Sequence, residues 1–432
     1  MPAAPPAAPP AAPPAPHDPY AALRVAPFRR YIAGLLTLIL ATQVQGVVVA
    51  WQVYAVTRDP LSLGLIGLAE ALPYIGFALW AGHVADRVDR RKLTMAATLV
   101  LLACSAGLLA LSLARPAPRA HVAAIYAIIF ASGIARSFLN PARTALSSEL
   151  VPRALLANSL TWRSTTWQTA AVGGPALGGL LYGFAGAPLA YALDTALMAV
   201  ALLAFLRVRH TPRPRPPAAA TLGRSLREGV AFVRAQPVLL GAMSLDLFSV
   251  LFGGATALLP IFADEILRVG PQGLGVLRAA PAAGAVAVSL WLAHRPPVRR
   301  TGPVLLGVVA AFGAAMVGFG LSRVFALSVG LLVLAGGVDM VSVNIRSMLL
   351  QMLVPEHLLG RVSSVNQIFI GSSNEIGAFE SGVAAKLVGA APSVVIGGVL
   401  TIGVVAATAW LVPPLRRMRA IPLADAGARA AS

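Results

Sequence analysis

Apolar runs close to 20 residues long recur along almost the whole chain, and they constrain the fold more than any other feature. Each run is long enough to cross a lipid bilayer as an α-helix. Only 12% of the 432 residues are charged, against roughly 25% in soluble domains. The sequence therefore predicts an all-α membrane protein, with no soluble domain large enough to hold a separate active site.

Turn and breaker residues divide these runs into twelve predicted transmembrane helices. The first six are predicted at 30–56, 61–84, 92–114, 120–145, 160–184 and 188–207. The second six are predicted at 238–263, 272–293, 303–321, 324–348, 363–387 and 393–412. Twelve helices imply two six-helix bundles, over residues 25–207 and 237–414.

The remaining segments are predicted as tails and a linker. Residues 1–24 begin with a Pro/Ala-rich tract that cannot bury a core, which predicts a disordered cytoplasmic tail. Residues 415–432 form a second cytoplasmic tail. Residues 208–236 join the bundles, and their apolar residues at helical spacing predict an amphipathic helix on the cytoplasmic membrane surface.

The basic residues indicate how the chain is oriented. With the N-terminus in the cytoplasm, 22 of the 34 Lys and Arg residues fall in cytoplasmic segments and six in the opposite loops. This is the positive-inside pattern of a multi-pass protein with both termini in the cytoplasm, and the expected location is the bacterial inner membrane. It also explains most of the net charge of +18. Because the basic residues form no single face, no nucleic-acid partner is predicted.

The two halves repeat each other at glycine, proline and arginine positions. At an offset of 203, Gly133, Arg143, Gly174 and Gly179 correspond to Gly336, Arg346, Gly377 and Gly382. At an offset of 208, Gly67, Pro73 and Gly76 correspond to Gly275, Pro281 and Gly284. Glycine and proline serve special backbone needs, so such matches are informative. Parallel repeats of this kind occur in secondary transporters, whose substrate sites lie near the midplane between the halves.

The loop after the second helix reads Gly82-His-Val-Ala-Asp86-Arg87-Val-Asp89-Arg90-Arg91-Lys92. It resembles the signature loop of the major facilitator superfamily, with Asp89 in place of the second glycine. The resemblance implies a cytoplasmic gate formed by Gly82, Asp86, Arg87 and Arg90 against the start of the eleventh helix. A carboxylate at a helix C-terminus is disfavoured by the macrodipole, so Asp86 needs a partner, and Arg90 is the nearest candidate. The alternative is an ordinary basic loop.

The fifth helix carries Gly174-Pro175-Ala-Leu-Gly178-Gly179. This run resembles the antiporter motif of the same superfamily, without its two earlier glycines, and favours export over uptake. The alternative is close helix packing through small residues. Together with Asn140-Pro-Ala-Arg143 and Gly360-Arg-Val-Ser-Ser364, the chain from about 25 to 415 resembles the branch that contains the enterobactin exporter and macrolide-efflux proteins.

Polar residues inside the helices are candidates for the transport site. A charge at the bilayer centre costs roughly 2.5–3.5 kcal/mol, so each should face protein or water. In this superfamily the first, fourth, seventh and tenth helices line the cavity. The predicted cavity residues are Gln43, Gln45, Arg136, Asn140, Asp246, Asp339 and Asn344. The predicted proton-coupling residues are Asp246 and Asp339, with Glu375 in reserve. The alternative for each is a structural hydrogen bond or ion pair.

Three partnerships follow from helix positions. Arg136 is predicted to pair with Asp246 or Asp339 across the cavity. Glu70 is predicted to pair with Lys386 or a neighbouring polar group when the periplasmic side is closed, where the second and eleventh helices meet. Asp194, on the more peripheral sixth helix, is assigned to packing.

The predicted function is secondary active export of a mid-sized organic compound, a siderophore or an amphipathic drug, by alternating access and proton antiport. A facilitator or uptake symporter is the alternative. An enzyme is not predicted, because no cluster of catalytic acids or histidines gathers at one membrane face. No metal-ligand cluster or phosphate-binding loop appears, so neither metal nor cofactor is predicted. A non-transporting membrane scaffold is not predicted, because it would not need charges that are costly to bury in the bilayer. The expected partners are substrate, protons and lipid, and the expected state is a monomer.

Overall fold

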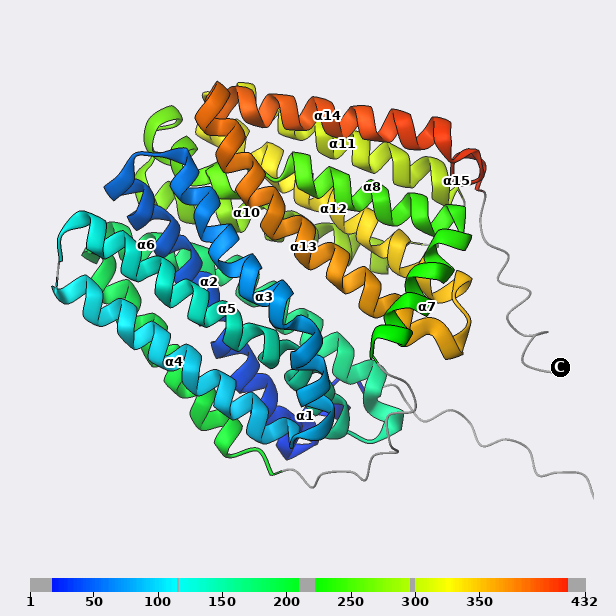
Figure 1. Ribbon diagram of the computed structural model, residues 1–432, viewed down its shortest axis with the longest axis horizontal. Coiled ribbons are helices and arrows are strands. Elements are labelled where there is room, and N and C mark those ends of the chain that lie inside the picture. Colours follow the sequence, from blue (N-terminus) through cyan, green and yellow to red (C-terminus); the bar gives the residue numbers. More distant parts are fainter. Residues whose placement is uncertain (1–17, 115, 210–221, 296–299, 419–432) are drawn as a thin grey trace, which may run out of the picture.

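The computed structural model describes residues 18–114, 116–209, 222–295 and 300–418, and every regular element in these ranges is a helix (Figure 1). The first half contains α1 (Ala21–Arg24), α2 (Ala26–Thr57), α3 (Pro60–Arg87), α4 (Arg90–Ala114), α5 (Pro118–Glu149), η1 (Arg153–Leu155) and α6 (Leu156–Leu206). Helix α7 (Leu222–Ala235) follows. The second half contains α8 (Pro237–Gly253), η2 (Ala255–Leu258), α9 (Leu259–Ile261), η3 (Phe262–Ile266), α10 (Gly270–Ala293), α11 (Thr301–Leu321), α12 (Phe325–Leu353), α13 (Glu356–Val388), α14 (Ala390–Leu411) and α15 (Pro413–Arg417).

Twelve long helical spans can be counted among the described residues. Helix α6 is two of them, because Gly186 (φ 76°, ψ −175°) turns the chain between the predicted fifth and sixth helices. The segment from α8 to η3 is the seventh. Ten spans satisfy a length and apolarity criterion. That count treats α6 as one span and omits α13, whose composition is diluted by Asn374, Glu375 and Glu380. The predicted all-α fold is confirmed.

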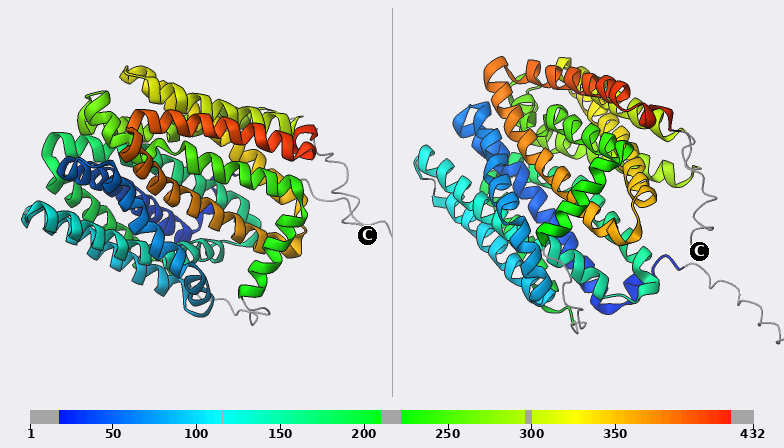
Figure 2. Two further views of the ribbon diagram at one scale, coloured as in Figure 1. Left: turned by 45° about the horizontal axis from the view of Figure 1, so that its top comes forward. Right: turned by 45° about the vertical axis from the view of Figure 1, so that its right-hand side comes forward.

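The two halves form separate bundles that lie side by side, the first coloured blue to green and the second green to red (Figures 1 and 2). Glycines bring the bundles together at two places. Gly64 on α3 meets Gly382 on α13, and Gly179 on α6 meets Gly275 on α10, with backbone atoms 2.7–3.3 Å from where a Cβ would lie. The absence of a side chain allows this close approach.

The predicted repeat appears in the packing of each half. An added Cβ on Gly133 of α5 would lie 2.7 Å from the ring of Pro73 on α3. At the corresponding place in the second half, a Cβ on Gly336 of α12 would lie 1.9 Å from the carbonyl oxygen of Pro281 on α10. Equivalent residues thus make equivalent contacts, and the two bundles are pseudo-symmetric.

Replacing Gly336 by Ala is expected to destabilise the second bundle. The new methyl group has to displace backbone, and overpacking of this kind costs about 1–3 kcal/mol. Gly330 on the same helix is the control, because no heavy atom lies within 4 Å of its added Cβ. Thermal unfolding of both variants in detergent measures the difference. Equal stability of Gly336→Ala and Gly330→Ala would contradict the close contact.

The seventh predicted helix, 238–263, is not continuous. Helix α8 ends at Gly253, and Gly254 has φ −76° and ψ 73°, outside the helical range. The hydroxyl of Ser381 donates to the Gly254 carbonyl oxygen at 3.2 Å. This hydrogen bond satisfies a carbonyl that the break removes from the helix. Irregular backbone at membrane depth is tolerated where it is buried in protein or lines a cavity.

Parts of the predicted tails and linker make contacts with the bundles. Within residues 18–24, Asn158 on α6 accepts from the Ala22 N–H at 3.0 Å and donates to the Pro19 carbonyl at 2.8 Å. Leu415 is fully buried. Helix α7 is the predicted amphipathic helix, but its apolar face packs on α13 and α8 through Val233, Val362 and neighbours. Its amphipathic pattern is therefore explained by protein contacts. Residues 1–17 and 419–432 lie outside the described part.

Candidate transport site

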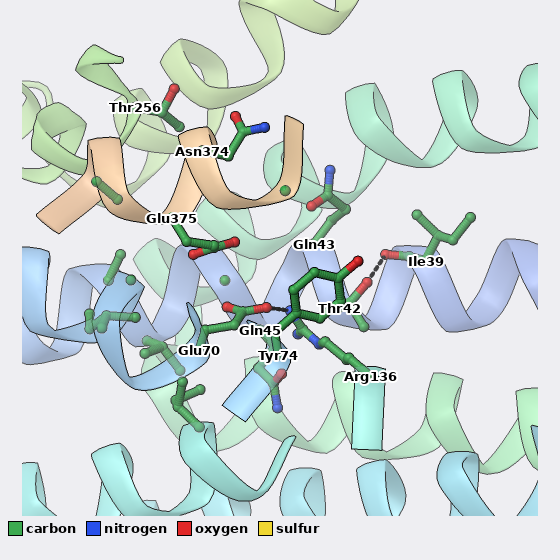
Figure 3. Close-up of a pocket in the computed structure, with 18 of the residues that line it drawn as sticks. Ile39, Thr42, Gln43, Gln45, Glu70, Tyr74, Arg136, Thr256, Asn374 and Glu375 are labelled. Carbon is green, nitrogen blue, oxygen red and sulfur yellow. Dashed lines mark hydrogen bonds and ion pairs between the residues drawn. The ribbon is translucent and has the colours of Figure 1, made fainter. Parts of the chain in front are cut away.

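A cavity of about 580 Å³ lies between the two bundles (Figure 3). Helices α2 to α6 line it from the first half, and η2, α10 and α13 line it from the second. Its polar lining consists of Thr42, Gln43, Gln45, Glu70, Tyr74, Arg136, Asn140, Arg143, Thr256, Arg278, Asn374 and Glu375. Ile39, Val49, Ile66 and Trp167 are among its apolar residues. A site of this size and mixed character is suited to an organic molecule.

Glu70 on α3 and Arg136 on α5 form an ion pair in this cavity, drawn as a dashed line in Figure 3. The contact of Gly133 with the α3 backbone at Glu70 brings the helices together. Arg136 lies three residues after Gly133, on the same helix face. The two side chains are 23% and 24% exposed. The predicted partners, an aspartate for Arg136 and Lys386 for Glu70, were both wrong, because packing within the first half pairs these two residues.

The second half contributes Glu375 and Arg278. Figure 3 shows the Glu375 carboxylate directed into the cavity on the side of Glu70. Glu375 lies within electrostatic reach of Glu70, Arg136 and Arg278. Arg278 also crosses the boundary, because its Nη1 donates to the Gly46 carbonyl on α2 at 2.7 Å. Carboxylates and guanidinium groups from both halves thus share one site.

The predicted cavity residues divide between two places. Gln43, Gln45, Arg136 and Asn140 line the central cavity. Asp246 and Asp339 line a smaller cavity of about 190 Å³ inside the second half. Asn344 is exposed and lines neither of these cavities. Thr256 and Asn374 line both cavities, which therefore adjoin.

Arg346 on α12 is the partner of the two aspartates. It forms an ion pair with Asp246 on α8. Its Nη2 lies 3.9 Å from Asp339, which is about two turns earlier on the same helix. In this conformation Arg346 therefore holds Asp246 in a structural ion pair, with Asp339 close by, which is the alternative to a proton-coupling role.

Sequence reasoning missed Glu70, Tyr74, Arg143, Arg278 and Asn374 as cavity residues. The internal repeat could have indicated two of these residues, Glu70 and Arg278. At the offset of 208 Glu70 corresponds to Arg278, and at 203 Arg136 corresponds to Asp339. Both correspondences exchange an acid and a base. Two charge-exchanged positions on equivalent helices indicate that the halves present complementary charges.

The end of the molecule where α2 turns into α3 is closed by contacts between the halves. Arg58 pairs with Asp264, and the Tyr54 hydroxyl donates to Glu265. Lys386 Nζ lies 2.9 Å from Asp59 Oδ2. Asp59 also caps α3 by accepting from the Leu61 N–H, and the hydrogen bond from Lys386 lowers the pKa of its carboxyl group. Lys386 therefore does bind across the boundary, but to Asp59 instead of Glu70.

Reversing the charge of Lys386 is expected to loosen this closed end. Exposed ion pairs contribute about 0.2–1 kcal/mol, so loss of the pair should raise opening by up to about fivefold, and the like-charge repulsion that Lys386→Glu introduces should add to this. Adding Asp59→Lys should restore closure. The measurement is labelling of a Thr256→Cys reporter, in a Cys104→Ser background, by an impermeant thiol reagent added from this end. No rescue in the double variant would contradict a direct pair.

The predicted gate residues lie at the opposite end, near α7. Arg90 forms an ion pair with Glu149 on α5, and Arg87 is exposed. The side chain of Asp86, the predicted partner of Arg90, lies outside the described part of the structure. No heavy atom among the described residues lies within 4 Å of an added Cβ at Gly82.

The glycine-rich run on α6 packs against both halves. A Cβ on Gly174 would lie 2.5 Å from Gln43 Cβ, and one on Gly178 would lie 3.1 Å from Val44. Gly179 faces Pro271 and Gly275 of the second half, while Pro175 is buried. The run thus fixes α2, with its cavity residue Gln43, and also forms part of the boundary between the halves.

A comparison with protein families identifies the family of the chain. The model of the Major Facilitator Superfamily matches residues 32–378. The chain belongs to this superfamily. It is a transporter of this superfamily and not an enzyme, in agreement with the sequence analysis. The major facilitator fold predicted from the sequence is confirmed.

Relatives and solved structures agree with the superfamily. The Enterobactin exporter EntS of Escherichia coli O1:K1 is 29% identical over 404 residues, covering 91% of this chain and 94% of the relative. The protein of the same name in Shigella flexneri is 28% identical over 401 residues. A D-xylose-proton symporter superposes with a TM-score of 0.69 at 12% identity, covering 93% of this chain and all of the other. An inward-facing bacterial homologue of the lysosomal transporter Spinster gives 0.66 at 16% identity, covering 92% and 99%.

Proposed function

We propose that this superfamily member exports a mid-sized organic compound by proton antiport. The observation that carries the proposal is the central cavity, where Glu70 and Arg136 of one half face Glu375 and Arg278 of the other. A cavity on the boundary changes its exposure when the two bundles rock, which is the basis of alternating access. The exporter name of the relatives supports the outward direction.

The proposed orientation places the α7 end in the cytoplasm, according to the positive-inside pattern. The membrane is then the bacterial inner membrane, with both termini on the cytoplasmic side. In this orientation the contacts of Lys386, Arg58 and Tyr54 would close the periplasmic end, and the described conformation would be inward-facing. In the outward-facing state Gly82, Asp86, Arg87 and Arg90 would brace α13 from the cytoplasmic side.

The proposed substrate class is a siderophore or an amphipathic drug. Arginine and amide groups of the cavity suit the oxygen atoms of such a compound. Ile39, Val49, Ile66 and Trp167 suit its apolar surface. Gln43, Gln45 and Asn140 would supply hydrogen bonds that fix orientation.

We assign the coupled proton to Glu375. It is the carboxylate of the second half that shares the central cavity with substrate. Without its own close ion pair among the described residues, it can change charge at smaller cost than Asp246, which Arg346 holds. Asp246 and Asp339 are the second candidate site, and they adjoin the same cavity through Thr256 and Asn374.

Transport by proteoliposomes tests the direction and the driving force. Enterobactin and a macrolide serve as probes, and an inward proton gradient is imposed across vesicles of known protein orientation. Antiport predicts probe movement against the proton flow, abolished by a protonophore. Probe movement with the proton flow would establish the alternative, an uptake symporter such as the D-xylose-proton symporter that shares this fold.

A further inference from the structure

Asp194 is a buried carboxylate that the proposed transport cycle does not use. It lies on the second part of α6, eight residues after the turn at Gly186, or about 12 Å into the membrane at 1.5 Å per residue. Its exposed fraction is 0%. Tyr191, three residues earlier on the same helix, belongs to one of the apolar clusters of this half, together with Leu108 and Ile129. A packing role alone gives no reason for a carboxylate at this depth, where an apolar or amide side chain would cost less.

Neither carboxylate oxygen of Asp194 has a hydrogen-bond partner of normal geometry among the described residues. Asp194 also forms no ion pair among the described residues, whose nearby pairs join other side chains. The buried hydroxyl of Ser105 on α4 lies beside the carboxyl group and is its hydrogen-bonding neighbour, at a geometry outside the normal range. An isolated carboxylate ion in such surroundings is strongly disfavoured, whereas a neutral carboxylic acid is tolerated.

The charged and titratable groups around Asp194 come from three helices. Cys104 on α4 lies within electrostatic reach of Asp194 and of Arg136. Tyr191 is on the same helix as Asp194 and donates its hydroxyl proton to Gln52 on α2 at 2.8 Å. Arg136 on α5 is the cation that acts on Asp194. Arg136 thus forms an ion pair with Glu70 and also acts electrostatically on Asp194.

Arg136 has donor capacity left for a second acid. Its Nη1 binds Glu70, while its Nε is buried without a hydrogen-bond partner among the described residues. A guanidinium group offers five N–H donors in a fixed fork. The free Nε leaves this guanidinium group with donor capacity for a second carboxylate.

We propose that Asp194 is a proton-binding site of the first half, occupied in this conformation, and that it competes with Glu70 for Arg136. With the proton bound, Asp194 is neutral and Arg136 stays on Glu70. Loss of the proton leaves a buried carboxylate that attracts Arg136 and releases Glu70 into the cavity. The site itself is independent of the proposed export, and only its coupling to transport rests on that function.

Infrared spectroscopy of the purified full-length chain in detergent tests the bound proton. A protonated carboxyl group has a carbonyl band that a carboxylate lacks. At neutral pH, Asp194→Asn should remove one such band, whereas Asp18→Asn, at a partly exposed acid paired with Arg24, should leave the spectrum unchanged. An unchanged band in Asp194→Asn would overturn the proposal. Because Asn is nearly isosteric with the neutral acid, the variant should also keep its unfolding temperature, and failure to fold would equally contradict a neutral Asp194.

The competition has its own test. Glu70→Gln frees Arg136, which should then ionise Asp194 and abolish its band at neutral pH. The band is measured as the difference between Glu70→Gln and the double variant Glu70→Gln/Asp194→Asn, which removes any contribution of Glu70 itself. A band of full intensity in this difference would overturn the competition for Arg136. None of these measurements requires a transport substrate.

Discussion

Replacing Glu375 by Gln is expected to abolish export driven by an imposed pH gradient while leaving substrate binding detectable. Glutamine keeps the size and polarity of the side chain but cannot exchange a proton. In the cavity, Glu375 is exposed to the charges of Glu70, Arg136 and Arg278, so its protonation changes the balance between the halves. Efflux from proteoliposomes measures the loss, and quenching of Trp167 fluorescence at the cavity wall reports binding.

Glu380→Gln is the matched control for this prediction. Glu380 lies five residues later on α13, is partly buried and lines neither of the cavities described above. It should leave gradient-driven export intact. Full export by Glu375→Gln, together with loss in Asp246→Asn or Asp339→Asn, would move the coupled proton to the Arg346 cluster.

Arg136→Gln is expected to be the most destabilising change in the cavity. It leaves Glu70 without its partner in a partly buried site. Removing one partner of a fully buried pair costs about 3–5 kcal/mol, and partial access to cavity water reduces this to about 2–3 kcal/mol. Denaturant unfolding in detergent measures the cost.

The double variant Glu70→Gln/Arg136→Gln separates the ion pair from other contacts of Arg136. It should be more stable than Arg136→Gln alone, because no unpaired carboxylate is left. Residues in direct contact show interaction energies of about 0.5–3 kcal/mol in such a cycle. Strictly additive effects would contradict the Glu70–Arg136 pair.

Most of the fold could be predicted from the sequence, because transmembrane helices are specified by local composition and the repeat by glycine and proline positions. Gly133 and Gly336 are informative in sequence because each occupies a contact that a side chain would block. The break at Gly254 could not be predicted in the same way. The break depends on Ser381, 127 residues away, whose hydroxyl donates a hydrogen bond to the Gly254 carbonyl oxygen that the break frees.

The ion-pair partners were the least predictable part of the site. Helix periodicity gives the face on which Arg136 lies, but several acids at similar depth satisfy the same pattern. The choice of Glu70 over Asp246 or Asp339 is made by the close packing of Gly133 against α3, a tertiary contact. Lys386 was correctly placed near the boundary between the halves. Its partner is Asp59 because that residue caps α3 at the same level.

Proton release on substrate binding tests most directly the claim that substrate and proton meet in the central cavity. Enterobactin or a macrolide is added to the weakly buffered, detergent-solubilised protein near neutral pH, and the protons released are followed with a pH indicator. The wild-type chain is expected to release protons as substrate binds, and Glu375→Gln is expected to bind substrate without that release. Equal proton release by the wild-type chain and Glu375→Gln would contradict the account.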